Sequence, residues 1–315
     1  MSNVGLIWTD LGAIGSYILA MASLDNGIAL FGENNGDIYR STNYGLTWTS
    51  LGIIASSRIN SIASLGNNIA VFGDDDRHVY RSTDRGLNWT DLGEVGSNYW
   101  IATIASLGSG IAILCVGSKI YRSVNYGANW TDLGITTHGR GLTSAYLGNG
   151  IAAIGDQDGY IYRSIDYGLT WTDLGLITSH SISNMPYLGN GIVIFSDYWQ
   201  YIYRSIDYGL TWTNLGIITS DASWGSAYLD NGIAVIGDNS RHVYRSIDYG
   251  LNWTDLGEVG SDGISAMAYL GKGIAILGDY SGHVYRSALA VTHRHHPTIP
   301  TEPNRGKELS RMGSL

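Results

Sequence analysis

Tryptophan recurs along this chain at a nearly fixed interval. Six tryptophans are separated by 41 residues each, and Trp8 stands 40 residues before the first of them. The six are Trp48, Trp89, Trp130, Trp171, Trp212 and Trp253. A fixed period of this length is typical of repeat proteins, in which each unit stacks on its neighbours. The 315 residues therefore form one repetitive domain and not two ordinary ones.

Each unit contains four short candidate strands. After Trp-Thr-Asp-Leu-Gly comes a variable stretch, followed by three apolar segments separated by Gly, Asn and Asp, such as 61–65, 69–72 and 78–82. No segment has a convincing helical period. Four strands in about 41 residues is the size of a propeller blade. The sequence predicts an all-β, seven-bladed β-propeller of four-stranded antiparallel blades.

The two ends of the chain complement one another. The last unit stops after its third strand at 283–287, and the missing fourth strand matches 3–8 at the N-terminus. We expect the N-terminal strand to complete the last blade, because six blades or an open solenoid would leave unpaired edges. The propeller then spans 1–287. The segment 288–315 loses the repeat, holds three of the four prolines and is expected to be a disordered tail.

A motif of the form Ser-x-Asp/Asn-x-Gly-x-x-Trp precedes each of the six regularly spaced tryptophans. Its hydroxyl and carboxylate or amide can accept hydrogen bonds from turn amides, and its Gly can adopt positive φ. The motif resembles the Asp-box, or bacterial neuraminidase repeat. That resemblance implies a turn between the third and fourth strands, opposite the ligand face, and structural roles for its acidic or amide residues. These are Asn3, Asn43, Asp84, Asn125, Asp166, Asp207 and Asp248.

The Asp-box resemblance also raises the possibility of a sialidase-like glycoside hydrolase. Sialidases use an arginine cluster, a Tyr with a partner Glu, and an Asp, and they carry an early Arg-Ile-Pro segment that this chain lacks. Here the arginines recur once per unit, which indicates a structural column: Arg40, Arg81, Arg122, Arg163, Arg204, Arg245 and Arg286. Glu94 and Glu258 occupy equivalent places in near-identical segments. We predict that the protein is not an enzyme and keep the hydrolase as an alternative.

A second resemblance lies in the amino-acid sequence of single units. The segment 159–171, Gly-Tyr-Ile-Tyr-Arg-Ser-Ile-Asp-Tyr-Gly-Leu-Thr-Trp, is similar to the repeat of the photosystem II assembly factor family. The resemblance implies a noncatalytic docking ring for a protein. The export signal or lipid-attachment Cys expected of that family is absent, so its partner cannot be carried over.

Three tryptophans stand outside the 41-residue register and fall in the variable stretches: Trp100, Trp199 and Trp224. With them we predict a ligand-binding set completed by Tyr99, Tyr198, Tyr201, Arg58 and Arg140. Propeller topology places both variable stretches on the face opposite the repeated motif. Aromatic side chains beside polar groups bind sugars and also form protein hot spots, so a glycan and a protein partner are both expected possibilities. A third possibility is that the rings only cover the channel.

Charge and composition restrict the remaining function classes. Residues 1–287 carry 14 Lys and Arg against 25 Asp and Glu, and this net charge of −11 disfavours nucleic acid. The triplet 74–76 lacks a recognisable calcium loop, so we predict no metal and no cofactor. Cys115 lies in an apolar segment and is interpreted as a small buried hydrophobe. No signal peptide or membrane segment is evident, which suggests the cytoplasm, a virion or another assembly, and leaves the oligomeric state open.

Overall fold

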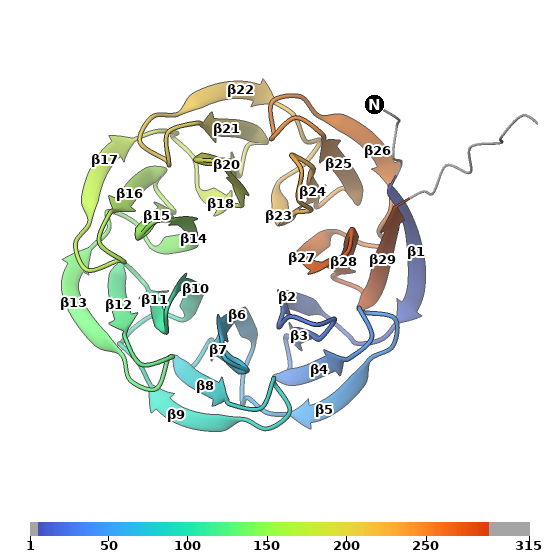
Figure 1. Cartoon of the computed structure of the whole chain (residues 1–315), viewed down its shortest axis with the longest axis horizontal. Coiled ribbons are helices and arrows are strands. Elements are labelled where there is room, and N and C mark those ends of the chain that lie inside the picture. Colours follow the sequence, from blue (N-terminus) through green and yellow to red (C-terminus); the bar gives the residue numbers. More distant parts are fainter. Residues whose placement is uncertain (1–5, 290–315) are drawn as a thin grey trace, which may run out of the picture.

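The computed structural model describes residues 6–289, and these residues form a ring of seven antiparallel β-sheets around a central channel (Figure 1). The predicted seven-bladed, all-β propeller is confirmed. Each sheet has one edge strand at the channel and the opposite edge strand on the outer rim (Figure 1). Between residues 6 and 289 there is no helix with the length and apolarity needed to span a bilayer.

The blades are numbered here in chain order from the first complete sheet. Blade 1 contains β2 (Ile18–Ser23), β3 (Ala29–Glu33), β4 (Asp37–Ser41) and β5 (Thr49–Ile53), and blade 2 contains β6 (Ile59–Gly66), β7 (Ile69–Asp74), β8 (His78–Ser82) and β9 (Thr90–Glu94). Blade 3 contains β10 (Ile101–Gly108), β11 (Ile111–Val116), β12 (Lys119–Ser123) and β13 (Thr131–Thr136), and blade 4 contains β14 (Gly141–Gly148), β15 (Ile151–Asp156), β16 (Tyr160–Ser164) and β17 (Thr172–Leu176).

The inner strand of blade 5 differs from the others because it is divided in two around Pro186, which cannot donate a ladder hydrogen bond. Blade 5 contains β18 (Ile182–Asn184), β19 (Tyr187–Gly189), β20 (Ile192–Asp197), β21 (Tyr201–Ser205) and β22 (Thr213–Ile217). Blade 6 contains β23 (Ser223–Tyr228), β24 (Ala234–Asp238), β25 (His242–Ser246) and β26 (Thr254–Glu258).

Blade 7 joins the two ends of the described chain. It contains β27 (Ile264–Gly271), β28 (Ile274–Asp279), β29 (His283–Leu289) and, as its outer strand, β1 (Leu6–Ala13). In the antiparallel β1–β29 ladder, Trp8 lies opposite Ser287. The predicted closure by the N-terminal strand is therefore confirmed. Asn3 and the histidines of 293–296 lie outside the described residues.

Three aromatic side chains pack together inside the blades, and this packing explains the repeated Tyr and Trp positions. In blade 1 the Phe31 ring stacks on Tyr39 at 4.5 Å between centroids and lies at 4.8 Å from Trp48. Phe31 is fully buried. Blades 2 and 5 repeat the arrangement with Phe72 and Phe195 at their centres.

The repeated turn between the third and fourth strands is held by its own side chains. In blade 2, Asp84 Oδ1 accepts hydrogen bonds from the Ser82 hydroxyl at 2.8 Å and from the Asn88 amide at 2.9 Å. Ser82 Oγ in turn accepts the Gly86 amide at 2.9 Å. Gly86 has a φ of +73°, a conformation that Gly adopts without steric cost. The Ser hydroxyl makes the same two contacts in the turns that begin at Ser41, Ser123, Ser164, Ser205 and Ser246.

The arginine column connects neighbouring blades. Arg40 Nε donates a hydrogen bond of 2.8 Å to the Arg85 carbonyl, 45 residues further along the chain. Four more arginines make the equivalent bond with the same spacing: Arg81, Arg122, Arg163 and Arg204. These bonds tie the third strand of each of these blades to the turn of the next blade.

A pair of small and large residues forms the contact between adjacent blades near the channel. A Cβ placed on Gly32 of blade 1 would lie 2.6 Å from Cγ2 of Ile59 in blade 2. At the boundary of blades 3 and 4 the glycine is on the other blade: Cys115 of blade 3 occupies the position of Gly32, and it faces Gly141 of blade 4. At the boundary of blades 5 and 6 both positions are serines, and Ser223 Oγ donates to Ser196 Oγ at 2.7 Å. Cys115 is buried, as expected.

Candidate functional site

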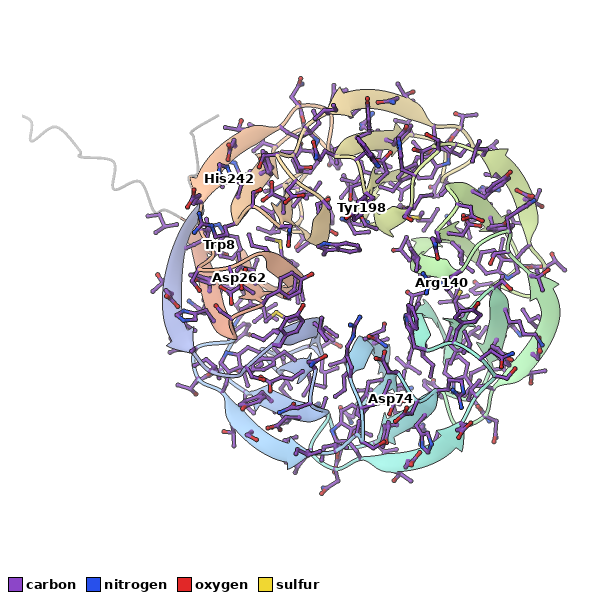
Figure 2. All side chains as sticks on the ribbon, turned by 180° about the vertical axis from the view of Figure 1, so that it is seen from behind. Trp8, Asp74, Arg140, Tyr198, His242 and Asp262 are labelled. Carbon is purple, nitrogen blue, oxygen red and sulfur yellow. The ribbon has the colours of Figure 1, made fainter. Side chains whose placement is uncertain are left out.

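Each blade contributes one large side chain to the same cavity at one end of the channel. We call this set the mouth ring, and in blade order it consists of Tyr17, Arg58, Trp100, Arg140, Tyr198, Trp224 and Tyr280. The cavity has a volume of about 740 Å³. Figure 2 shows Arg140 and Tyr198 at different points on the edge of the central opening. A cavity of this size lies within the range of sites that bind ligands, about 300–1,000 Å³.

The local fold explains why these positions face the channel. Four of the seven residues, Tyr17, Arg58, Trp100 and Arg140, directly precede the inner strand of their blades. Tyr198 and Tyr280 directly follow the second strand of theirs. The position before the inner strand and the position after the second strand are neighbours in space. In blade 5, the Tyr198 amide donates to the carbonyl of Ser181, the residue that precedes β18. Trp224 is the second residue of its inner strand, β23. It stands two positions after the residue that precedes the strand, so its side chain points to the same side of the sheet as that residue.

Most of the mouth ring is paired through aromatic contacts between adjacent blades. Tyr17 and Tyr280 stack with their centroids 4.7 Å apart, and Tyr198 meets Trp224 edge to face at 6.3 Å. The guanidinium carbon of Arg140 lies 4.5 Å from the centroid of Trp100, within cation–π range. Such contacts fix large side chains in one orientation before a ligand arrives.

Two arginines supply the charge of the cavity. Arg140 Nε donates to the side-chain oxygen of Gln157. Arg58 Nε donates to Asn60 Oδ1 at 2.8 Å and lies 3.9 Å from the Asp75 carboxylate. Among the described side chains that line the cavity, Arg58 and Arg140 are the only charged ones.

Burial raises the pKa of the Tyr280 hydroxyl to about 12, although the positive charge of Arg58 acts in the opposite direction. Tyr280 therefore stays neutral at physiological pH and can act as a hydrogen-bond donor. The mouth ring thus combines neutral aromatic surface with two guanidinium groups that carry positive charge.

The structure brings five of the eight predicted ligand-binding residues into the cavity: Arg58, Trp100, Arg140, Tyr198 and Trp224. Tyr99 does not line it; its ring packs against Gly117, where a Cβ would lie 2.6 Å from the ring, and lies 5.8 Å from the Arg140 guanidinium.

The other two predicted residues lie beside His180, away from the cavity. Trp199 is 60% exposed, and its ring centroid is 5.3 Å from that of His180. Tyr201 stacks on the same His180 at 6.4 Å. Both Tyr198 and Trp199 lie in the turn that follows β20, and of the two only Tyr198 lines the cavity.

Sequence reasoning missed Tyr17 and Tyr280. The signal that could have found them is the register: Tyr17 stands 41 residues before Arg58, and Tyr280 stands 82 residues, two repeats, after Tyr198.

A column of buried carboxylates holds the loops beside the mouth ring, and sequence reasoning did not single it out. Asp238 is fully buried; its Oδ2 accepts the amides of Ser220 and Asp221 at 3.1 and 3.2 Å, and its Oδ1 accepts the His242 amide. Asp279 makes the matching contacts with Ser261 in blade 7. Burial acts to raise the pKa of Asp279, but hydrogen bonds from Ser281 and Ser261 outweigh it and leave the pKa below its usual value. The equivalent residues are Glu33, Asp74, Asp156 and Asp197.

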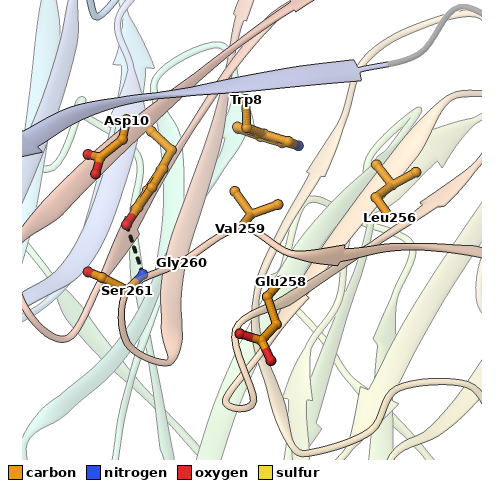
Figure 3. A pocket seen from close by; sticks show the side chains of 8 residues that line it. Trp8, Asp10, Leu256, Glu258, Val259, Gly260 and Ser261 are labelled. Atoms are coloured by element: carbon orange, nitrogen blue, oxygen red, sulfur yellow. Dashed lines mark hydrogen bonds between the residues drawn. The ribbon is translucent and has the colours of Figure 1, made fainter.

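A second hollow, of about 480 Å³, lies between blade 6 and blade 7 and is lined by Trp8, Asp10, Glu258 and Tyr285, among others (Figure 3). Its carboxylates are already engaged within the protein: Asp10 contacts His283 at 3.0 Å, and Glu258 contacts Arg241 at 2.8 Å. Within residues 6–289, no group of three or more His, Cys, Asp or Glu side chains is placed to hold a metal ion.

Comparison with known proteins shows the fold and not the family. No family model matches the sequence, and no curated protein is significantly similar to it. A solved structure of YCF48 bound to a D1 peptide superposes with a TM-score of 0.72 at 18% identity, covering 89% of this chain and 96% of the other. YCF48 from Cyanidioschyzon merolae gives a TM-score of 0.68 at 16% identity, covering 89% and 98%. The WD40 β-propeller domain of Doa1 gives 0.75 at 11% identity, covering 90% and 97%. These likenesses agree on the propeller architecture.

Proposed function

We propose that the protein is a noncatalytic recognition ring that binds a segment of a partner protein at the mouth ring. The observation that carries this proposal is that all seven blades each direct one large aromatic or arginine side chain into a single cavity. A ring used only for stability has no need of large, partly exposed side chains at every position of one opening.

The residue types favour a protein partner. Trp, Tyr and Arg are the side chains that dominate protein–protein hot spots, and here they are held by stacking, edge-to-face and cation–π contacts with one another. A propeller of similar fold has been solved with a bound peptide, which supports the proposal. Glycan binding uses the same aromatic chemistry and is the alternative outcome of the test below. A lectin with one site per blade would repeat the same residue in register, whereas the mouth ring changes residue type from blade to blade.

We also propose that the repeated Ser-x-Asp/Asn-x-Gly turn is an Asp-box with a purely structural role. Its side chains are occupied by turn amides, as shown for Ser82 and Asp84. The arginine column is likewise occupied, by backbone carbonyls of the next blade. The sialidase alternative needs such groups to be available to a substrate, and turnover of a fluorogenic sialoside would restore it.

The proposal is tested by probing the purified protein on two surfaces, an array of random-sequence peptides and a glycan array. Three proteins are compared: the wild type, a Trp100→Ser/Trp224→Ser double variant, and Trp199→Ser as the matched control. We expect saturable binding to a subset of peptides by the wild type and by the Trp199→Ser control, and loss of that binding in the double variant. Binding to glycans alone would replace the protein partner with a sugar. Absence of binding on both surfaces would contradict the proposal.

A further inference from the structure

The charge of the mouth ring is opposite to that of the molecule around it. Residues 6–287 carry 25 Asp and Glu against 14 Lys and Arg. A cavity lined at random in such a protein would contain more acidic than basic side chains. Instead, its described lining contains two arginines, Arg58 and Arg140, and no carboxylate. The channel opening is therefore a small positive site on a negative protein, which attracts anionic groups and not cationic ones.

Both guanidinium groups donate through Nε to a neutral side-chain amide, and of the two only Arg58 has a carboxylate within 4.0 Å. Arg140 donates through Nε to Gln157, and no carboxylate of residues 6–289 lies within 4.0 Å of its nitrogens. Arg58 donates through Nε to Asn60, and its one acidic neighbour, Asp75, is 3.9 Å away and itself accepts the Asn60 amide at 2.7 Å. Fixing an arginine through Nε leaves its terminal nitrogens to bind a carboxylate with two parallel hydrogen bonds.

The remaining five members of the mouth ring are aromatic, and they divide the opening into two sectors. Blades 2, 3 and 4 contribute Arg58, Trp100 and Arg140, a cationic sector with one ring at its centre. Blades 5, 6, 7 and 1 contribute four consecutive aromatic residues, which form one edge-to-face pair and one stacked pair. A ligand that fills both sectors needs an anionic group and an apolar group on one short segment.

Building on the proposed docking function, we infer that the partner segment is an acidic peptide: its carboxylate binds Arg140 and Arg58, and an adjacent apolar side chain packs on the four aromatic residues. Aspartate or glutamate side chains and a free C-terminus all present this carboxylate. The two arginines attract any acidic peptide, so selection among acidic peptides comes from the apolar contacts with the four aromatic residues.

Selection from a random dodecapeptide library tests the inference and separates the two sources of carboxylate. One format displays peptides with a free C-terminus, and the other attaches them through the C-terminus. We expect selected peptides to be enriched in Asp or Glu next to an apolar residue in both formats, or to appear only in the free C-terminus format if the chain end is recognised. Selected peptides should bind an Arg58→Gln/Arg140→Gln variant about tenfold or more weakly, since each charge-assisted hydrogen bond is lost.

Arg241→Gln is the matched control, because Arg241 pairs with Glu258 outside the cavity and its loss should leave peptide affinity unchanged. Thermal unfolding of each variant verifies that it is folded. Selection of neutral peptides whose affinity survives the double arginine change would overturn the carboxylate inference while leaving the docking function intact. Failure to enrich any peptide would overturn both. Binding restricted to sialylated or uronic-acid glycans would assign the two arginines to an acidic sugar and likewise overturn the inference.

Discussion

Arg286 donates a 2.7 Å hydrogen bond from Nε to the carbonyl of Tyr44, although the two residues are 242 positions apart in the chain. Every other described bond of the arginine column runs forward by 45 residues. Arg286 therefore makes, across the junction of blades 7 and 1, the contact that its counterparts make along the chain. Together with the β1–β29 ladder, it converts a row of sheets into a closed ring.

Replacement of Arg286 by Gln removes this closing contact and leaves the Tyr44 carbonyl without its charged donor. We expect the free energy of unfolding to fall by about 1–2 kcal/mol, the lower part of the range for a hydrogen bond to a charged group, because the site is partly solvated. Urea unfolding measures the change. Arg58→Gln is the comparison, since Arg58 contacts Asn60 and Asp75 within its own blade. An equal loss in both variants, or none in Arg286→Gln, would argue against a special role for the closing bond.

The turn aspartates predict an acid dependence of stability. Burial acts to raise the pKa values of Asp84, Asp166, Asp207 and Asp248, but turn hydrogen bonds outweigh it and hold them below the ordinary 3.8. Because the folded-state pKa is the lower one, the stabilisation is complete above the unfolded pKa and is lost as the pH falls through the folded value.

Changing all four to Asn should therefore flatten the decline of stability between about pH 5 and pH 2. An Asn side chain fits this position, because Asn43 and Asn125 occupy it in two other turns and accept the equivalent hydrogen bond from the backbone N–H. Urea unfolding across a pH series provides the measurement. Parallel wild-type and variant curves would show that these carboxylates do not carry the acid response.

Cys115 should be inert in the folded protein. It is 1% exposed, and burial raises the pKa of its thiol to about 12, so neither the thiolate nor access to it is present. We expect no reaction with Ellman's reagent in native buffer and full reaction in urea. A Ser97→Cys variant, at an exposed position, should react at once under native conditions. Rapid native labelling of Cys115 itself would mean that blades 3 and 4 separate in solution.

The fold was predictable because one strong signal, the period of the tryptophans, fixes the unit and its number. The mouth ring was predictable only in part. Trp100 and Trp224 stand out because only three tryptophans, these two and Trp199, lie outside the repeat column, whereas Tyr17 and Tyr280 are hidden among 22 tyrosines. Comparison of the same repeat position in all units finds both.

Other features of the site were not predictable from residue type. Trp199 is an out-of-register tryptophan like Trp100, but it lies in the turn after β20, and residue type does not reveal that its neighbour Tyr198 lines the cavity instead. The carboxylate of Asp238 is fully buried, and Asp is ordinarily an exposed residue, so only its recurrence at one register indicates a structural role.

The contact between blades offers a prediction of its own, because the chain contains two solutions to the same packing problem. Gly32 faces Ile59 at the boundary of blades 1 and 2, and Cys115 faces Gly141 at the boundary of blades 3 and 4. Gly32→Cys alone should lower the free energy of unfolding by about 1–3 kcal/mol, because the added side chain overpacks the boundary. Ile59→Gly alone should lower the free energy of unfolding by about 3–5 kcal/mol, because it opens a cavity.

The double variant Gly32→Cys/Ile59→Gly rebuilds the pair found at Cys115 and Gly141, so its cost should be smaller than the sum of the two single changes by at least about 1 kcal/mol. Urea unfolding of the four proteins in the cycle gives this coupling energy. As control, Gly32→Cys is combined with Ile264→Gly, which packs on Gly237 at another boundary and should add within about 0.5 kcal/mol. Additive costs in the Gly32/Ile59 cycle would mean that the two blade boundaries are not interchangeable and that the reversal at Cys115 depends on the rest of blades 3 and 4.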